Sequence, residues 1–197
     1  QRLCAIASER QVIIFTHRLS LLTMVQLYAG KVEIKPEIIC IREEPWGTGE
    51  PGDTPFFAKK PESALKQLIN DRLSKAKKLL NEHGKEVYEP YAKSLCSDFR
   101  DLLERMIEVE LMGDIVQRYR REVHTKKIAG LAKISEADCK YFDDLMTKYS
   151  RYVHPQPIEA PVRLPEPDEL ETDFTALKDW QAEFKKRPLT PALQEAQ

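Results

Sequence analysis

The spacing of hydrophobic and polar residues changes character after the loop that follows residue 42. Before it, Val12-Ile13-Ile14-Phe15 is a continuous β-branched and aromatic run, which predicts a strand buried on both faces, as in parallel sheets. A helix is predicted over 18–29 and a second short strand over 36–41. A strand–helix–strand unit of this size cannot complete a sheet alone. We therefore expect residues 1–42 to fold poorly by themselves or to pair with another chain.

After the loop, the apolar residues recur at helical spacing. The predicted helices cover 65–80, 88–107, 115–127, 135–149 and 166–186. Ser135, with Asp138 three residues later, has the spacing of a helix start. The predicted fold class is mostly α, with a short α/β remnant followed by an all-α helical bundle.

Glycine and proline divide the chain. They are concentrated in 43–61, which predicts a loop, and prolines recur through 155–167, which predicts an extended connector before the last helix. The expected domains are therefore 1–55, with its connecting loop, and a helical domain over 56–197.

The composition of the chain argues against some classes of binding partner. The 197 residues carry 31 basic and 32 acidic side chains, a net charge of −1, so no global field favours nucleic acid or an anionic membrane. No apolar run reaches the roughly 20 residues of a membrane span, so no membrane partner is expected. The chain opens without a start Met or a signal-peptide pattern, which favours a mature product or an excised fragment.

The spacing of the cysteines indicates their redox state and the cellular compartment. They are widely spaced, in apolar surroundings, and without a C-x-x-C pair, so neither a zinc site nor a disulfide scaffold is expected. They are Cys4, Cys40, Cys96 and Cys139. We expect buried free thiols, a cytoplasmic location and no metal site.

The first motif follows the first predicted strand. Thr16-His17 at the end of Val12-Ile13-Ile14-Phe15 resembles the switch segment, or H-loop, of ABC-type ATPases, the AAA-like group that includes the SMC-like proteins. The resemblance implies that His17 contacts a nucleotide γ-phosphate, where an imidazole can donate a hydrogen bond to developing charge. The alternative is a solvent-facing histidine at a strand end.

No G-x-x-x-x-G-K-[ST] loop is present, so these residues cannot build a complete nucleotide site. The resemblance implies ATP and Mg²⁺ as cofactors of the full-length protein, none for this chain alone, and an N-terminal ATPase half as partner.

The second set of motifs lies in the helical region. The stretches 99–108, 116–120, 149–154 and 164–180 resemble the C-terminal region of ABC-type ATPases of bacterial defence islands. Some of those relatives are anticodon nucleases of the HEPN type, whose helical domain carries Arg-x-x-x-Glu and a later His. The resemblance implies catalytic roles for Arg100, Glu104 and His154.

The chemistry of these residues agrees with metal-independent cleavage of RNA. A histidine can transfer protons near neutral pH, and a guanidinium can hold phosphate by two hydrogen bonds. Arg100 and Glu104 are four residues apart, on one edge of a helix. The alternative is an ion pair on a solvated helix face, worth about 0.3–0.5 kcal/mol.

A rival basic cluster lies between 118 and 133. Arg118 and His124 also fit the R-x(4–6)-H spacing of HEPN nucleases, and helical spacing places Arg120, His124 and Lys127 on one edge. We expect this cluster to bind RNA phosphates. The alternative is a solvated basic face whose charge complements that of the acidic segment 159–173.

Three hypotheses follow. In the first, the chain is the C-terminal part of an antiphage-defence ATPase whose helical domain is a tRNA endonuclease, gated by nucleotide-driven homodimerisation. In the second, the helical domain of the same ATPase is catalytically silent and docks an effector protein or a partner subunit. In the third, the chain is an unrelated helical adaptor.

Overall fold

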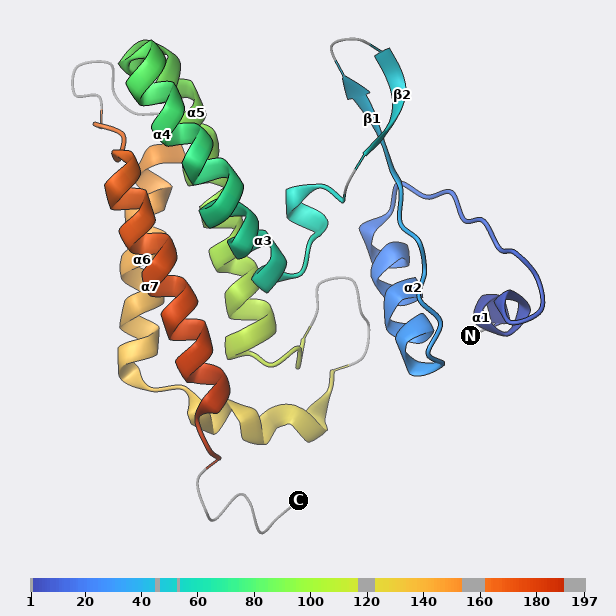
Figure 1. Ribbon diagram of the computed structural model, residues 1–197. Helices are drawn as coiled ribbons and strands as arrows, with labels where there is room; N and C mark the ends of the chain where they lie inside the picture. Colours follow the sequence, from blue (N-terminus) through green and yellow to red (C-terminus); the bar gives the residue numbers. More distant parts are fainter. Residues whose placement is uncertain (1, 45–46, 53, 117–122, 154–161, 190–197) are drawn as a thin grey trace. The chain divides into compact units, whose positions relative to one another are not determined.

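A computed structural model describes residues 2–44, 47–52, 54–116, 123–153 and 162–189. The chain divides into two units, 1–58 and 59–197. The mostly α fold class predicted from the sequence is confirmed: helices dominate, and the sheet in the described residues is a single pair of strands (Figure 1).

The first unit contains two helices and a hairpin. Its elements are α1 (Arg2–Ala7), α2 (Leu19–Lys31), β1 (Cys40–Glu44), β2 (Gly47–Gly52) and the short 3-10 turn η1 (Phe56–Ala58). The strands pair antiparallel, with an irregularity between Arg42 and Glu43. The helix predicted over 18–29 is confirmed, whereas the strand predicted over 36–41 begins only at Cys40.

The strand predicted over 12–15 is wrong for this chain. Residues 11–16 have no regular secondary structure, and none of residues 11–15 makes a backbone hydrogen bond to a described residue. Ile13 is 68% exposed and Phe15 is 89% exposed. A strand exists only through hydrogen bonds to a neighbouring strand, and the described chain supplies none at this position.

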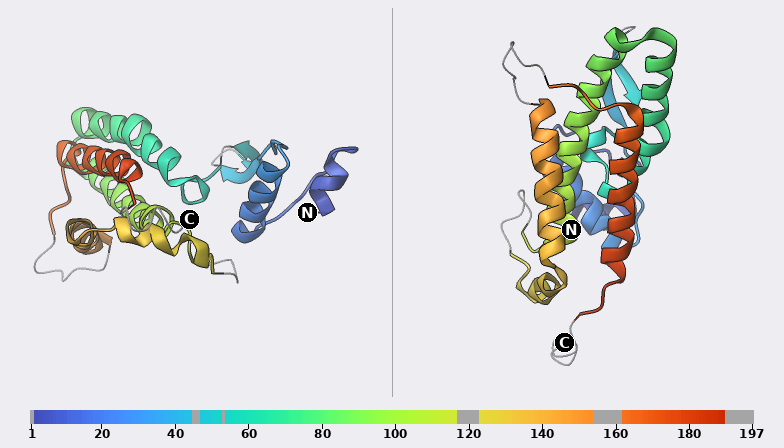
Figure 2. Two further views of the ribbon diagram at one scale, coloured as in Figure 1. Left: turned by 90° about the horizontal axis from the view of Figure 1, so that it is seen from below. Right: turned by 90° about the vertical axis from the view of Figure 1, so that its left-hand side faces the viewer.

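The second unit is built from long helices that lie side by side (Figures 1 and 2). A helical run of α3 (Pro61–Gln67), the π-helical turn η2 (Leu68–Arg72) and α4 (Leu73–His83) is followed by α5 (Lys85–Met106) and a second π turn, η3 (Ile107–Leu111). The 3-10 helix η4 (Thr125–Lys133) then leads into α6 (Glu136–Val153), and α7 (Pro167–Lys186) follows. The helices predicted over 65–80, 88–107, 135–149 and 166–186 are confirmed.

The core of this unit is aromatic and aliphatic. The ring of Phe99 on α5 lies 4.6 Å from the rings of both Tyr149 on α6 and Phe174 on α7, measured between centroids. These three side chains are fully buried, so one contact cluster joins three helices. Burial of each large side chain contributes about 1.5–3 kcal/mol, which makes this cluster a major source of stability.

Two helix boundaries follow from local chemistry. Gly84 separates α4 from α5 with φ of 76° and ψ of −174°, a conformation that side chains disfavour. At the start of α6, the Asp138 N–H donates to Ser135 Oγ at 3.3 Å and the Ser135 N–H donates to Asp138 Oδ2 at 2.8 Å. This reciprocal pair is the capping box that the sequence spacing predicted.

The helix predicted over 115–127 is wrong in its described parts. Residues 115–116 form a bend, 123–124 have no helical structure, and the 3-10 helix η4 begins at Thr125. Val116 and Val123, expected on a buried stripe, are 45% and 54% exposed. Apolar spacing produces a helix reliably only where the stripe finds a surface to cover, which these side chains do not.

The helices of the described residues differ from membrane spans. Not one of them combines the length and the apolar character that crossing a bilayer requires.

Candidate functional site

The polar cluster predicted on α5 is formed by Arg100, Glu104 and a residue of α6. Arg100 Nη1 lies 3.0 Å from Glu104 Oε1, and Arg100 Nε–H donates to Ser150 Oγ at 3.2 Å. One contact stays within α5 and the other crosses to α6. The guanidinium is thereby held in one orientation at the edge of the interface between these helices.

The Arg100 cluster is half-buried. The side chain of Arg100 is 24% exposed and that of Glu104 is 31% exposed. A guanidinium has five N–H donors, and the two contacts above use two of them, so its planar fork keeps donor capacity for a phosphate. Partial burial lowers the local dielectric, which strengthens any charged contact made there.

His154, the third residue of the predicted triad, lies outside the described residues. It directly follows Val153, the last residue of α6, and comes four positions after Ser150 in the sequence. The structure therefore brings together Arg100 and Glu104, and adds Ser150, which sequence reasoning missed. No sequence signal pairs Ser150 with Arg100, because the two are 50 residues apart.

Only part of the basic cluster between 118 and 133 lies in the described residues. Arg118 and Arg120 lie outside the described residues. His124 is half-buried, and its N–H donates to the Ile115 carbonyl at 2.9 Å, while Lys127 is exposed on η4. His124 precedes the 3-10 helix, so the α-helical edge expected to align it with Lys127 does not form.

The nucleotide-related histidine is exposed. His17 lies in the irregular segment before α2, next to Thr16, whose Oγ1 accepts a hydrogen bond from the Arg18 N–H at 3.0 Å. No grouping of His, Cys, Asp and Glu suited to a metal ion occurs among the described residues. These residues fit a single contact to a nucleotide held by other parts of a protein, and they do not fit a complete site for ATP and Mg²⁺.

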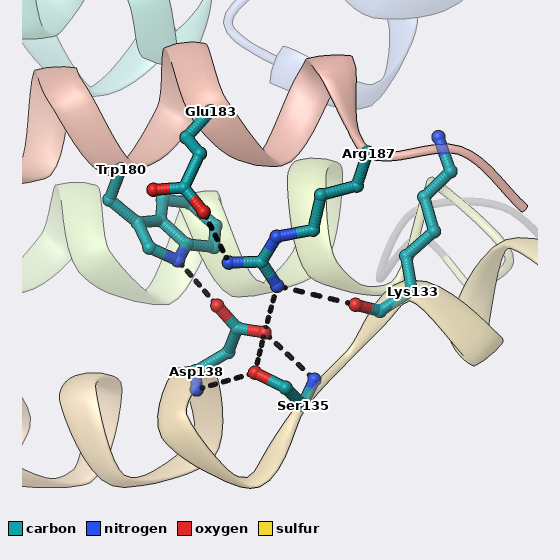
Figure 3. A network of polar contacts seen from close by, with 6 residues as sticks. All are labelled: Lys133, Ser135, Asp138, Trp180, Glu183 and Arg187. Carbon is teal, nitrogen blue, oxygen red and sulfur yellow. Dashed lines mark hydrogen bonds and ion pairs between the residues drawn. The ribbon is translucent and has the colours of Figure 1, made fainter.

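An extensive polar network joins η4, α6 and the end of α7 (Figure 3). Asp138 on α6 is 2% exposed. Its Oδ1 accepts a hydrogen bond from Trp180 Nε1 at 2.8 Å, and its Oδ2 accepts from Ser135 and from Arg187, which follows α7. Arg187 also donates to the Lys133 carbonyl at 3.3 Å, at the end of η4.

The Asp138 carboxylate is paired with the Arg187 guanidinium, which also contacts Glu183. Burial alone would raise the pKa of Asp138, but the hydrogen bonds from Arg187, Ser135 and Trp180 outweigh it and hold that pKa well below its usual range. The carboxylate is therefore ionised at neutral pH and locked in place. The Ser135–Asp138 spacing was visible in the sequence, whereas Trp180 and Arg187, 42 and 49 residues away, were not.

A second cluster connects α6 and α7. Lys148 Nζ lies 2.7 Å from both Glu169 and Asp173, and Tyr149 O–H donates to Asp173 Oδ2 at 2.6 Å. Burial, together with the Asp173 carboxylate, raises the pKa of Tyr149. The cluster borders a pocket lined by Asp143, Asp144, Thr147, Lys148, Arg151, Tyr152 and Val162. Its cation is already paired with carboxylates of this chain, so the cluster serves helix packing.

The cysteines differ from expectation. Cys96 is buried, and burial raises its pKa to about 12, so this thiol stays protonated and unreactive at neutral pH. Cys4 and Cys40 are half-buried, however, and Cys139 is exposed. The prediction of four buried thiols is therefore wrong for three of them. Apolar residues next to a cysteine in the sequence do not decide which face of a helix or strand is covered.

Comparisons with protein-family models, with curated proteins and with solved structures found no match for this chain.

Proposed function

We propose that the chain is the C-terminal part of an ABC-type ATPase of antiphage defence, and that its helical unit is a metal-independent endonuclease acting on RNA of the tRNA class. The ATPase assignment is supported by the first unit. Its apolar segment 12–15 has no regular secondary structure, is exposed at Ile13, Ile14 and Phe15, lacks backbone partners among the described residues, and leads directly to Thr16 and His17. A segment of this kind is stable only as a strand inside a sheet supplied by other residues.

The nuclease assignment is carried by one observation, the half-buried guanidinium of Arg100 held between Glu104 and Ser150. Arg100 would bind the scissile phosphate and stabilise the charge that grows on it during cleavage. Glu104 would orient Arg100. His154 would take a proton from the attacking 2′-hydroxyl or give one to the leaving 5′-oxygen.

Incubation of the purified chain with tRNA in EDTA tests this mechanism. Cleavage should persist in EDTA, and Arg100→Ala and His154→Ala should each lower the rate by at least about 100-fold, the usual contribution of an acid–base or charge-stabilising group. Arg118→Ala belongs to the basic cluster expected to bind RNA, so it should retain the cleavage rate when RNA is saturating. Loss of cleavage in Arg118→Ala with retention in Arg100→Ala would instead assign catalysis to the rival pair of Arg118 and His124.

A second candidate function is docking of an effector protein or a partner subunit by a catalytically silent helical unit. The contact of Arg100 with Ser150 favours it, because that contact also joins α5 to α6 and could serve packing alone. Absence of cleavage, even when an N-terminal ATPase half and ATP are supplied, would select this function. Absence of a Walker-type loop from the parent reading frame would refute the ATPase assignment in both.

A further inference from the structure

The 3-10 helix η4 (Thr125–Lys133) is an unusual element. Runs of 3-10 helix longer than three or four residues are uncommon, yet η4 spans nine residues and buries none of them. It lies at the end of the helical unit where α6 begins (Figures 1 and 2). Its order is therefore not explained by core packing of its own side chains.

Both ends of η4 are anchored by hydrogen bonds. Before it, the His124 N–H donates to the Ile115 carbonyl at 2.9 Å. At its other end, the Lys133 carbonyl accepts a hydrogen bond from Arg187, which is itself held by the buried Asp138 (Figure 3). The tertiary network thus fixes the position of η4, while Lys126 and Lys127 are exposed and Lys133 is half-buried.

The side chains of η4 fall into ridges, because residues three apart are eclipsed in a 3-10 helix. Lys127, Gly130 and Lys133 form one ridge, and Lys126 borders it. Lys127 and Lys133 are separated by six residues, about 12 Å at a rise of about 2.0 Å per residue. Gly130 between them leaves the ridge open, since a Cβ built there would meet nothing within 4 Å.

The charged side chains of η4 are all positive. Residues 123–134 contain three lysines and no acidic residue, in a chain where acidic residues slightly outnumber basic ones. None of the three lysines makes an ion pair with a described residue, whereas Lys148 and Lys185 on the long helices are paired with carboxylates. The two exposed aliphatic side chains of η4, Ile128 and Leu131, are ordinary for a protein surface. Charge is the feature that selects a partner here.

We propose that the lysine ridge of η4, formed by Lys126, Lys127 and Lys133, is a pre-positioned track for the phosphates of single-stranded RNA. This inference rests on the proposed function, from which RNA is taken as the polyanion. It extends that function from the cleavage chemistry at Arg100 to a separate surface that holds the substrate. Lysine ammonium groups that contact phosphates do not distinguish between bases, so the track should bind RNA without base preference.

The experiment measures binding of the full chain to a fluorescent single-stranded oligonucleotide in EDTA across a series of salt concentrations. The triple variant Lys126→Ala, Lys127→Ala, Lys133→Ala should bind more weakly at low salt. Each lost phosphate contact lowers the salt-dependence slope by about 0.7 for single strands, so the slope should fall by about 2. The control removes three exposed lysines from α4 and α5 instead, Lys75→Ala, Lys78→Ala and Lys93→Ala, and should leave the slope unchanged. Circular dichroism should report the same helix content and melting temperature for both variants.

Two results would overturn the inference. One is an equal loss of slope in the control variant, which would mean that net charge alone attracts RNA. The other is equally tight, lysine-dependent binding of polyglutamate, which would identify an acidic protein as the partner. Failure of the nuclease is separate: binding through η4 without cleavage would leave this inference intact, whereas a loss of cleavage in Arg100→Ala that far exceeds its loss of binding, with the lysine-dependent part of the slope kept, would support both.

Discussion

Asp138 is a buried carboxylate whose hydrogen-bonding capacity is fully used. Its two oxygens accept bonds from an indole, a hydroxyl, a backbone N–H and a guanidinium. Such a group stabilises a fold only while its partners are present, because a buried charge without them costs several kcal/mol. The same side chain caps α6 and fastens the residue that follows α7, so one residue joins two elements.

Removal of this carboxylate should destabilise the helical unit. Asp138→Ala leaves Trp180 Nε1 without its acceptor and Arg187 without its buried partner, and we expect the free energy of unfolding to fall by about 3 kcal/mol. Urea denaturation measures it. Asp143→Ala, which changes an exposed aspartate of the same helix, should stay within about 0.5 kcal/mol of the parent. A loss no larger than that of the control would contradict the role assigned to Asp138.

The depressed pKa of Asp138 also predicts a pH dependence. A carboxyl whose pKa is lowered by folding contributes stability above its unfolded pKa of about 4, and that stability is lost as the pH falls toward the folded value. The difference in unfolding free energy between the parent and Asp138→Asn should be largest near pH 7 and should shrink below about pH 4. Urea denaturation at pH 7, 4 and 3 tests this; a constant difference across that range would be incompatible with the network.

At the scale of elements, the bundle depends on where its helices end. α4 and α5 are joined by Gly84 alone, and its positive φ allows the chain to leave one helix and enter the next at once. The ion pair between Arg72 of η2 and Asp98 of α5 then joins α5 to the turn that precedes α4. A residue with a Cβ at the junction would strain the turn that sets this packing.

Gly84→Ala should therefore destabilise the unit by about 1–3 kcal/mol, the usual strain of a non-glycine residue in this region of φ and ψ. Gly130→Ala is the matched control, because Gly130 has no positive φ and open space around its Cα. It should be neutral or slightly stabilising. Thermal unfolding followed by circular dichroism distinguishes the two; equal melting temperatures would show that the junction tolerates a side chain.

At the scale of the whole molecule, the core is unevenly divided. Apart from Ala29, every buried apolar residue described belongs to unit 59–197. Unit 1–58 instead exposes large apolar side chains along α1, the segment 12–15 and α2. Burial of apolar surface is the main driving force of folding, so the two units differ in their capacity to fold alone.

Residues 59–197 expressed alone should unfold cooperatively, with a melting temperature close to that of the full chain. Residues 1–58 alone should show no cooperative transition and fast amide exchange throughout, because they lack a core to protect their hydrogen bonds. Hydrogen exchange followed by mass spectrometry on both pieces and on the full chain tests this. Strong protection in isolated 1–58 would remove the main support for a partner sheet.

Local pattern was sufficient wherever a helix could bury its own apolar stripe. The helix ending at Gly84, the capping box of Ser135 and Asp138, and the contact between Arg100 and Glu104 all depend on residues close in sequence, and all were predictable. Prediction failed where the outcome depended on a distant surface. Residues 12–15 have the composition of a strand and no strand beside them among the described residues, and Val116 and Val123 have helical spacing but are exposed.

What the sequence by itself determined is the mostly helical class, the ends of the long helices and the residue types available for phosphate chemistry, since these follow from interactions within a few residues. Only the tertiary structure decided that Ser150 meets Arg100, that Trp180 and Arg187 converge on Asp138, and that η4 is anchored yet exposed. The physical reason is distance along the chain: contacts between residues 40 to 50 positions apart depend on how helices pack, and no local period records that packing.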